Sequence, residues 1–150
     1  MTVLAREYTD LDHALDEVRV VLEECAAKQD EAATLNDETV RYAQLVLQEW
    51  IANLLQHANF RGRSPTIHVH LTVEEQHFTC TVVDNSEGFD LTEKLPAREE
   101  LTDDLPERGM GLRIIDACTD HLSYASTESG RYRLEFSIPA DHDPWLSTIF

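Results

Sequence analysis

Residues 47–60 read LQEWIANLLQHANF, and this stretch decides the fold that we expect. Its apolar residues recur three and four positions apart, which is the spacing that buries one face of a helix. Asn36 is placed to cap this helix, and the pattern extends it to about Ala58. The buried face comprises Val40, Ala43, Leu47, Trp50, Ile51, Leu54 and Ala58.

A polar stripe of the same helix carries Glu49, Asn53 and His57, each four residues from the next. Residues four apart share a helix face, so a carboxylate, a carboxamide and an imidazole project together beside the core. The side-chain oxygen of Asn is a hard, neutral ligand for Mg²⁺, which takes substrate phosphates as further ligands. A Glu one turn away is placed to orient or deprotonate a hydroxyl nucleophile. Spacing alone favours a solvated polar face.

Two strands are expected directly after this helix. Residues 61–65, RGRSP, break the helix, because glycine and proline both disfavour its continuation. Residues 67–73 and 78–84 then alternate apolar and polar side chains, which predicts two half-buried strands. Residues 74–77 join them as a hairpin loop.

The C-terminal half is expected to hold a lid, a third helix and two closing strands. Residues 85–108 carry two prolines, many charges and few apolar side chains, and so long a connection is typical of a lid. A helix is predicted from Gly109 to about His121. Residues 122–125 and 132–138 are predicted as the closing strands.

Upstream, Thr2–Tyr8 is expected as a short strand and residues 10–25 as an amphipathic helix. The resulting order does not alternate as in a doubly wound fold. We therefore expect an α+β, two-layer sandwich with a mixed, mainly antiparallel sheet and helices on one face. The domain is expected to span residues 1–140, followed by a C-terminal tail at 141–150.

Composition excludes several classes of function. The net charge of −17 argues against nucleic acid as a partner, because phosphate neutralisation needs clustered Lys and Arg. No apolar run approaches the ~20 residues that span a bilayer, so no membrane association is expected. The N-terminus does not read as a secretory signal, and three widely spaced cysteines read as reduced, packed thiols. We expect a cytoplasmic protein.

Two further motifs follow the helix along the chain. Asp84 ends an apolar strand, where a carboxylate can accept a hydrogen bond from an amino group such as that of adenine. Gly88 lets the backbone turn or approach a ligand closely. The stretch Arg108-Gly109-Met110-Gly111-Leu112 opens a helix, and helix N-termini offer backbone N–H groups to phosphate. Separately, a polar turn and a flexible loop explain these two motifs.

In order and spacing, the three motifs together resemble the boxes of the GHKL ATPase and kinase superfamily. Residues 49–58 resemble its N box, residues 84–89 its first glycine box, and residues 109–112 its second. The stretches LQEWIANLLQHANF and ERGMGLRIIDACTDHLSY are similar to the small anti-sigma factor serine/threonine kinases. The resemblance covers roughly residues 5 to 138.

The resemblance implies an ATP-binding sandwich of the Bergerat type with ATP and Mg²⁺ as its cofactors. By resemblance, Asn53 would ligate Mg²⁺, Asp84 would hold the adenine amino group, and Gly88 would shape the pocket. Residues 92–108 would form the ATP lid. Glu49 would be the catalytic base.

The remaining cofactor-binding residues are also expected by resemblance. Gly109 and Gly111 would wrap the phosphates, and Arg108 would add a charge-assisted contact. The cofactor-binding set comprises Asn53, His57, Asp84, Gly88, Arg108, Gly109, Met110, Gly111 and Leu112.

By resemblance, the expected function is that of a protein serine/threonine kinase that binds ATP or ADP. It would phosphorylate a small antagonist protein and sequester a sigma factor. The chain is expected to form a homodimer. The alternative is a regulatory module without kinase activity. Ser86 favours it slightly, because the first glycine box usually has glycine there, and Glu87 adds negative charge. A sensor-kinase ATPase half is disfavoured, because no phosphoacceptor helix precedes the domain.

Overall fold

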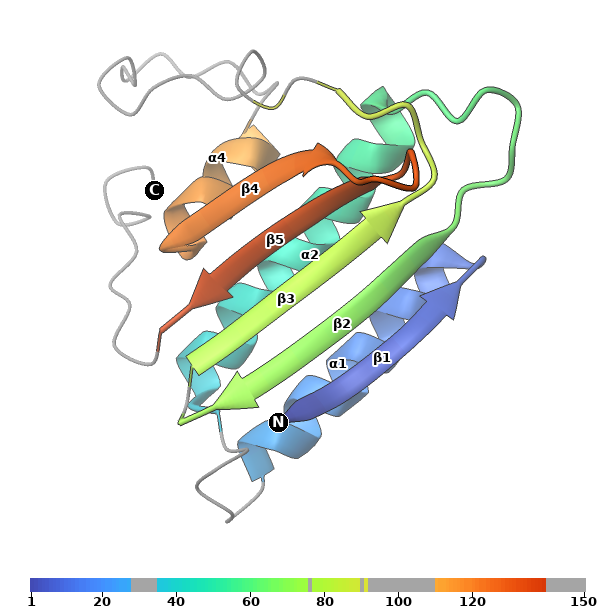
Figure 1. Cartoon of the computed structure of the whole chain (residues 1–150). Helices are drawn as coiled ribbons and strands as arrows, with labels where there is room; N and C mark the ends of the chain where they lie inside the picture. Colours follow the sequence, from blue (N-terminus) through green and yellow to red (C-terminus); the bar gives the residue numbers. More distant parts are fainter. Residues whose placement is uncertain (28–34, 76, 90, 92–109, 140–150) are drawn as a thin grey trace.

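The computed structural model describes residues 1–27, 35–75, 77–89, 91 and 110–139. Its chain runs through five strands and three helices in these ranges (Figure 1). In order they are β1 (Thr2–Tyr8), α1 (Leu11–Ala27), α2 (Asp37–His57), β2 (Ile67–Glu74), β3 (His77–Asp84), α4 (Met110–Cys118), β4 (His121–Ser126) and β5 (Tyr132–Ile138).

The strands form one sheet in the order β1-β2-β3-β5-β4. Each neighbouring pair of these strands is antiparallel. The predicted α+β class is therefore confirmed, whereas the word "mixed" is wrong for the described strands. The reason is local: β2 and β3, and likewise β4 and β5, follow each other through short turns, which reverse the chain.

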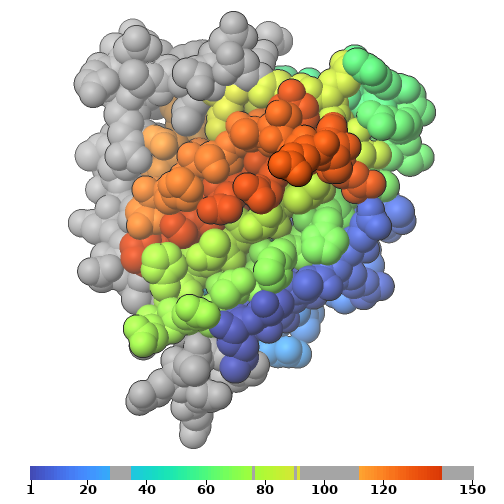
Figure 2. All heavy atoms as spheres, viewed as in Figure 1, coloured from blue at the N-terminus to red at the C-terminus, as the bar shows by residue number. Residues whose placement is uncertain are grey.

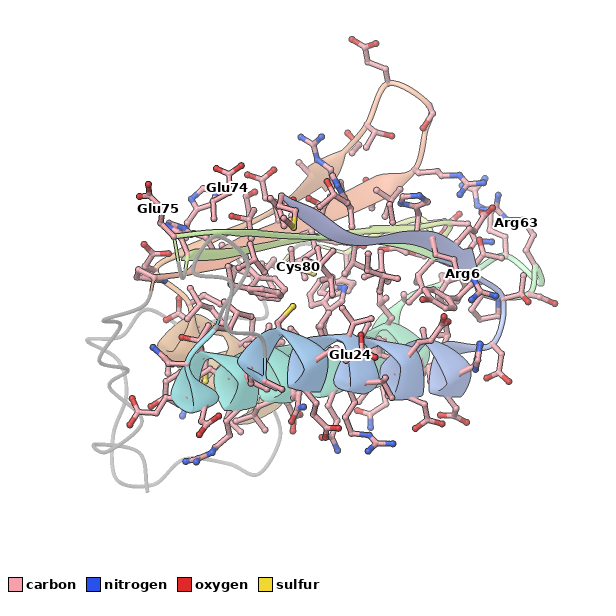
Figure 3. The ribbon with its side chains drawn as sticks, turned by 90° about the horizontal axis from the view of Figure 1, so that it is seen from below. Arg6, Glu24, Arg63, Glu74, Glu75 and Cys80 are labelled. Atoms are coloured by element: carbon pink, nitrogen blue, oxygen red, sulfur yellow. The ribbon has the colours of Figure 1, made fainter. Side chains whose placement is uncertain are left out.

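The helices cover one face of this sheet, and the core lies between the two layers. Figure 3 shows the sheet edge-on above the helices, with Cys80 between them. Alternate residues of the strands point inward because side chains of a strand alternate between its faces. The inward set of the three central strands comprises Ile67, Val69, Leu71, Val73, Phe78, Cys80, Val82, Asp84, Leu134, Phe136 and Ile138, all almost fully buried.

Helix α2 begins as the sequence predicts. The Asn36 side chain accepts a hydrogen bond from the Thr39 N–H at 2.7 Å, which satisfies one of the donors that a helix start leaves free. Trp50, at the centre of the apolar stripe, has no exposed surface. The predicted stripe therefore faces the sheet, and the helix presents its flank to the site described below.

Helix α4 ends earlier than predicted. It stops at Cys118, and His121 already belongs to β4, so the predicted end at about His121 is wrong. The Thr119 hydroxyl donates to the Ile115 carbonyl at 2.9 Å, and the Asp120 N–H donates to the Ser137 carbonyl of β5 at 3.1 Å. A side chain that bonds to the carbonyl one turn back competes with continued helix.

The hairpin between β2 and β3 is also shorter than expected. Glu74 pairs with His77, so both belong to the ladder and not to the loop. Glu75 has a positive φ of 51°, the left-handed conformation that tight turns use. Figure 3 shows Glu74 and Glu75 at the end of the sheet opposite Arg63.

All three cysteines are buried. Burial raises the pKa of the Cys118 thiol to about 12 and that of Cys80 well above its usual value. Both thiols therefore stay protonated at neutral pH. In the described residues, no helix is both long and apolar enough to cross a bilayer.

Candidate functional site

Helix α2 holds the carboxamide of Asn53 in a fixed orientation. Asn53 is only 9% exposed, and its Nδ2 donates to the Glu49 backbone carbonyl at 2.9 Å. This bond anchors the amide nitrogen to the helix and directs Oδ1 away from the backbone. The Glu49 side chain one turn earlier is half-buried, whereas His57 is exposed at the helix end. Of the predicted polar stripe, only Asn53 is part of the interior.

Asp84 places a carboxylate at the end of the buried face of β3. Its side chain points to the same face as Val82 and Cys80, and it has no exposed surface. Oδ1 accepts hydrogen bonds from the Ser86 N–H at 2.9 Å and from the Ser86 hydroxyl. Oδ2 accepts one from the Tyr124 hydroxyl of β4 at 2.9 Å. Each oxygen of this buried carboxylate therefore has at least one hydrogen-bond donor.

Ser86 stabilises this turn through its side chain, which the sequence analysis did not predict. The Gly88 N–H donates to the Ser86 oxygen at 2.9 Å while the Ser86 hydroxyl donates to Asp84. One hydroxyl thus links the carboxylate to the glycine two residues later. Serine is favoured in turns because its hydroxyl makes local bonds of this kind. The sequence thus contained the signal, although Ser86 stands out there only as a replacement for the usual glycine.

The turn after β3 is fastened to the segment that follows α2. The Asn85 side chain accepts from the Thr66 N–H at 2.9 Å and donates to the Ser64 carbonyl at 3.0 Å. The Glu87 N–H donates to the Asn59 carbonyl at 2.9 Å. The Glu87 carboxylate pairs with Arg61, which offsets the negative charge that the sequence placed near the site. These bonds hold the Asp84 turn against the end of α2.

Four aromatic side chains form a cluster around Tyr124, whose hydroxyl bonds to Asp84. Tyr124 lies 4.8 Å from Trp50, 5.1 Å from Phe89 and 5.3 Å from Tyr132, measured between ring centroids. Phe89 in turn lies 5.5 Å from Trp50. Burial, followed by the charge of Asp84, raises the pKa of Tyr124, so its hydroxyl remains a donor at neutral pH. We refer to Trp50, Phe89, Tyr124 and Tyr132 as the aromatic cluster.

Gly88 is the point of closest approach between the turn and this cluster. Its φ is +72°, and a Cβ placed on it would lie 2.4 Å from the Tyr132 ring. Glycine is therefore required twice, by the left-handed backbone and by the adjacent ring.

We expect Gly88→Ala to lower the free energy of unfolding by about 2–4 kcal/mol, because strain of the left-handed backbone adds to overlap with Tyr132. Gly130→Ala is the matched control, since Gly130 has a φ of +82° but nothing within 4 Å of an added Cβ. It isolates the backbone cost of about 1 kcal/mol. Urea denaturation measures both variants. Equal losses would contradict the close packing of Tyr132 on Gly88.

Helix α4 contributes its N-terminal end. Helix α4 packs against α2, and Figure 1 shows it beside β4. Met110 and Gly111 form its first turn, while Leu112 is 4% exposed and belongs to the hydrophobic core. Leu112 therefore supports the helix through packing. Arg108, Gly109 and the predicted lid at 92–108 lie outside the described residues, as does the tail at 141–150.

The structure thus brings the Asn53 helix and the Asp84 turn together. Trp50 lies one turn before Asn53 on α2 and contacts Tyr124, whose hydroxyl reaches Asp84. The Trp50 indole N–H is buried without a hydrogen-bond partner among the described residues. An amide oxygen, a carboxylate, an unpaired donor and a helix start form a donor set suited to a nucleotide with Mg²⁺. In this conformation, however, Asp84 is fully covered.

Comparison with known proteins also points to a nucleotide as the ligand. The family model of the histidine kinase-like ATPase domain matches residues 9–136. This match extends from the start of α1 almost to the end of β5 and includes all three motifs. No curated protein matches the chain.

Proposed function

We propose a function from one premise: the chain belongs to the histidine kinase-like ATPase domain family. Membership in this family suggests ATP binding. Our proposal is more specific, namely an Mg-ATP-dependent serine/threonine protein kinase of the anti-sigma factor type. The observation that carries it is the Asn53 amide, which α2 fixes one turn from the Glu49 carboxylate.

Each residue of the site has a part in binding under this proposal. Asn53 Oδ1 would ligate Mg²⁺, and Asp84 would accept a hydrogen bond from the adenine amino group. Backbone N–H groups of Gly109, Met110 and Gly111 would receive the phosphates. Arg108 would add a cation, and Leu112 would hold α4 in place. When bound, Mg²⁺ neutralises charge on the β- and γ-phosphates.

Glu49 is the residue that we assign to the chemical step. Its half-buried carboxylate lies on the same helix face as Asn53, so an acceptor hydroxyl beside it would be near the phosphate chain. Glu49 would take the proton as the hydroxyl oxygen attacks the γ-phosphorus, and ADP would leave. Phosphoryl transfer depends on positioning and charge neutralisation more than on covalent help from the protein. A site with a single base and many donors suits it.

The protein partners belong to the same proposal. The acceptor would be a small antagonist protein, and a sigma factor would be the sequestered partner of a homodimer. The alternative is a regulatory module without kinase activity. The covered Asp84 is the observation that favours this alternative, because its oxygens already have partners within the chain.

The test has two stages. In the first, calorimetry is expected to show ATP binding that requires Mg²⁺. In the second, the immobilised chain is loaded with ATP or with ADP and exposed to its own cell extract, and the captured proteins are incubated with γ-labelled ATP. We expect label on a serine or threonine of a small captured protein. ATP binding without any labelled acceptor would instead support the module, and absence of ATP binding would contradict the kinase.

A further inference from the structure

We propose that Tyr124 is a specificity-determining residue that closes the base site when no nucleotide is bound. Its hydroxyl occupies the Asp84 oxygen that an amino-bearing base would use, so the base has to displace it. This inference rests on the proposed ATP binding and adds to it a competitor within the chain. It concerns the base end of the site, not the catalytic end.

The two oxygens of Asp84 have partners of different kinds. Oδ1 is bonded to the N–H and hydroxyl of Ser86, two residues further along the same turn. That turn is also fastened to Ser64, Thr66 and Asn59. Oδ2 is bonded to the Tyr124 hydroxyl, which comes from another strand 40 residues away. Oδ2 is therefore the oxygen that a side-chain movement can release without breaking the turn.

The position of Tyr124 permits that movement. It lies on β4, which is an edge strand of the sheet, and its side chain is half-buried. The neighbouring Ser123 and Ala125 are exposed. Trp50, Phe89 and Tyr132 contact the ring, whereas no strand of the described sheet pairs with β4 on its outer side. Displacement of the hydroxyl therefore requires the ring to shift within the aromatic cluster, beside the unpaired side of β4.

The chemistry of the contact sets the preference for the base. A buried carboxylate oxygen that loses a donor pays for its desolvation unless another donor replaces the first. The exocyclic amino group of adenine is such a donor. The keto group of hypoxanthine, at the same ring position, is an acceptor and repels the carboxylate. An amino group of the base can therefore replace the Tyr124 hydroxyl at Asp84. A keto group cannot, so the Tyr124 hydroxyl stays bonded to Asp84.

A closed site also weakens the apparent affinity for the correct nucleotide. Part of the binding free energy is used to displace Tyr124, so only the fraction of molecules with Asp84 released binds at full strength. Tyr124→Phe removes the hydroxyl and keeps the ring in the aromatic cluster. One hydrogen bond to a charged group corresponds to roughly a tenfold change in affinity.

The experiment measures binding of ATP and of inosine triphosphate by calorimetry in the presence of Mg²⁺. We expect Tyr124→Phe to bind ATP roughly ten times more tightly than the wild-type chain, with no gain for inosine triphosphate. Tyr8→Phe is the matched control, because Tyr8 is a buried tyrosine on β1, the opposite edge strand. It is expected to leave both affinities unchanged.

A second measurement keeps Tyr124 intact, in case its replacement unfolds the chain. Trp50 lies 4.8 Å from the Tyr124 ring, so its fluorescence reports departure of that ring. In a Trp145→Phe background, ATP is expected to change the Trp50 emission, and inosine triphosphate at the same concentration is not.

The outcomes separate this inference from the proposed function. If the wild-type chain binds ATP but Tyr124→Phe binds it equally or more weakly, the inference is wrong and ATP binding stands. A gain that is as large for inosine triphosphate would also overturn it, because the effect would then be one of space. If no variant binds ATP, the proposed function fails and the inference fails with it.

Discussion

Replacement of Asn53 by alanine is expected to abolish Mg²⁺-dependent ATP binding, with a loss of affinity of at least about 100-fold. The variant loses the amide oxygen that we assign to Mg²⁺, on a side chain that the bond from Nδ2 to the Glu49 carbonyl holds to the helix. Calorimetric titration with ATP, with and without Mg²⁺, measures the loss. The metal-dependent share of the affinity should disappear, while any metal-independent share stays.

The Asn53 experiment needs a control for folding, because its Nδ2 also bonds to the Glu49 carbonyl at 2.9 Å. Loss of that bond costs about 1 kcal/mol of stability, which circular dichroism and urea denaturation can follow. Gln48→Ala is the matched variant, since it removes an exposed amide from the same helix. It should bind ATP normally. Unchanged Mg²⁺-dependent affinity in Asn53→Ala would remove Asn53 as the metal ligand.

Glu49→Gln is expected to retain ATP binding and to lose about 10²- to 10⁴-fold in the rate of phosphotransfer. The substitution keeps the size of the side chain and leaves the backbone carbonyl that holds Asn53 in place. It removes the negative charge and with it the capacity to accept a proton. The result is measured as transfer of label from ATP to the acceptor protein, together with the ATP affinity of the variant.

Glu38→Gln is the matched control for the second experiment, because Glu38 lies exposed in the first turn of the same helix. Its phosphotransfer rate should equal that of the wild-type chain. Full activity of Glu49→Gln would show that another group takes the proton. A parallel loss of ATP affinity would instead assign Glu49 to nucleotide binding.

Much of the fold was predictable because two local rules agree along this chain. The three-four spacing around Trp50 and the alternation at residues 67–73 and 78–84 each identify a buried face, and the structure buries those faces. The end of α4 was not predictable in this way. It is decided by the Thr119 hydroxyl and by the bond from Asp120 to Ser137, and the latter exists only once β5 has paired with β4.

The residues of the candidate site likewise divide into those that belong to a local motif and those whose contacts form only in the folded chain. Asn53, Asp84 and Gly88 were found because each belongs to a motif of a few residues. Alternation along β3 also predicts that Asp84 points inward, since it follows Val82 by two positions. Tyr124 was missed because its bond to Asp84 spans 40 residues, helix α4 among them. A tyrosine on a short strand carries no local signal of its partner.

The burial of every native thiol has a practical consequence for measuring this protein. The outward face of the sheet, which Figure 2 shows without a helix over it, includes the exposed Ala125 beside Tyr124. A cysteine introduced there would be the accessible one, since Cys25, Cys80 and Cys118 are all enclosed. A maleimide dye at position 125 would then report on the edge strand β4 without any native cysteine having been removed.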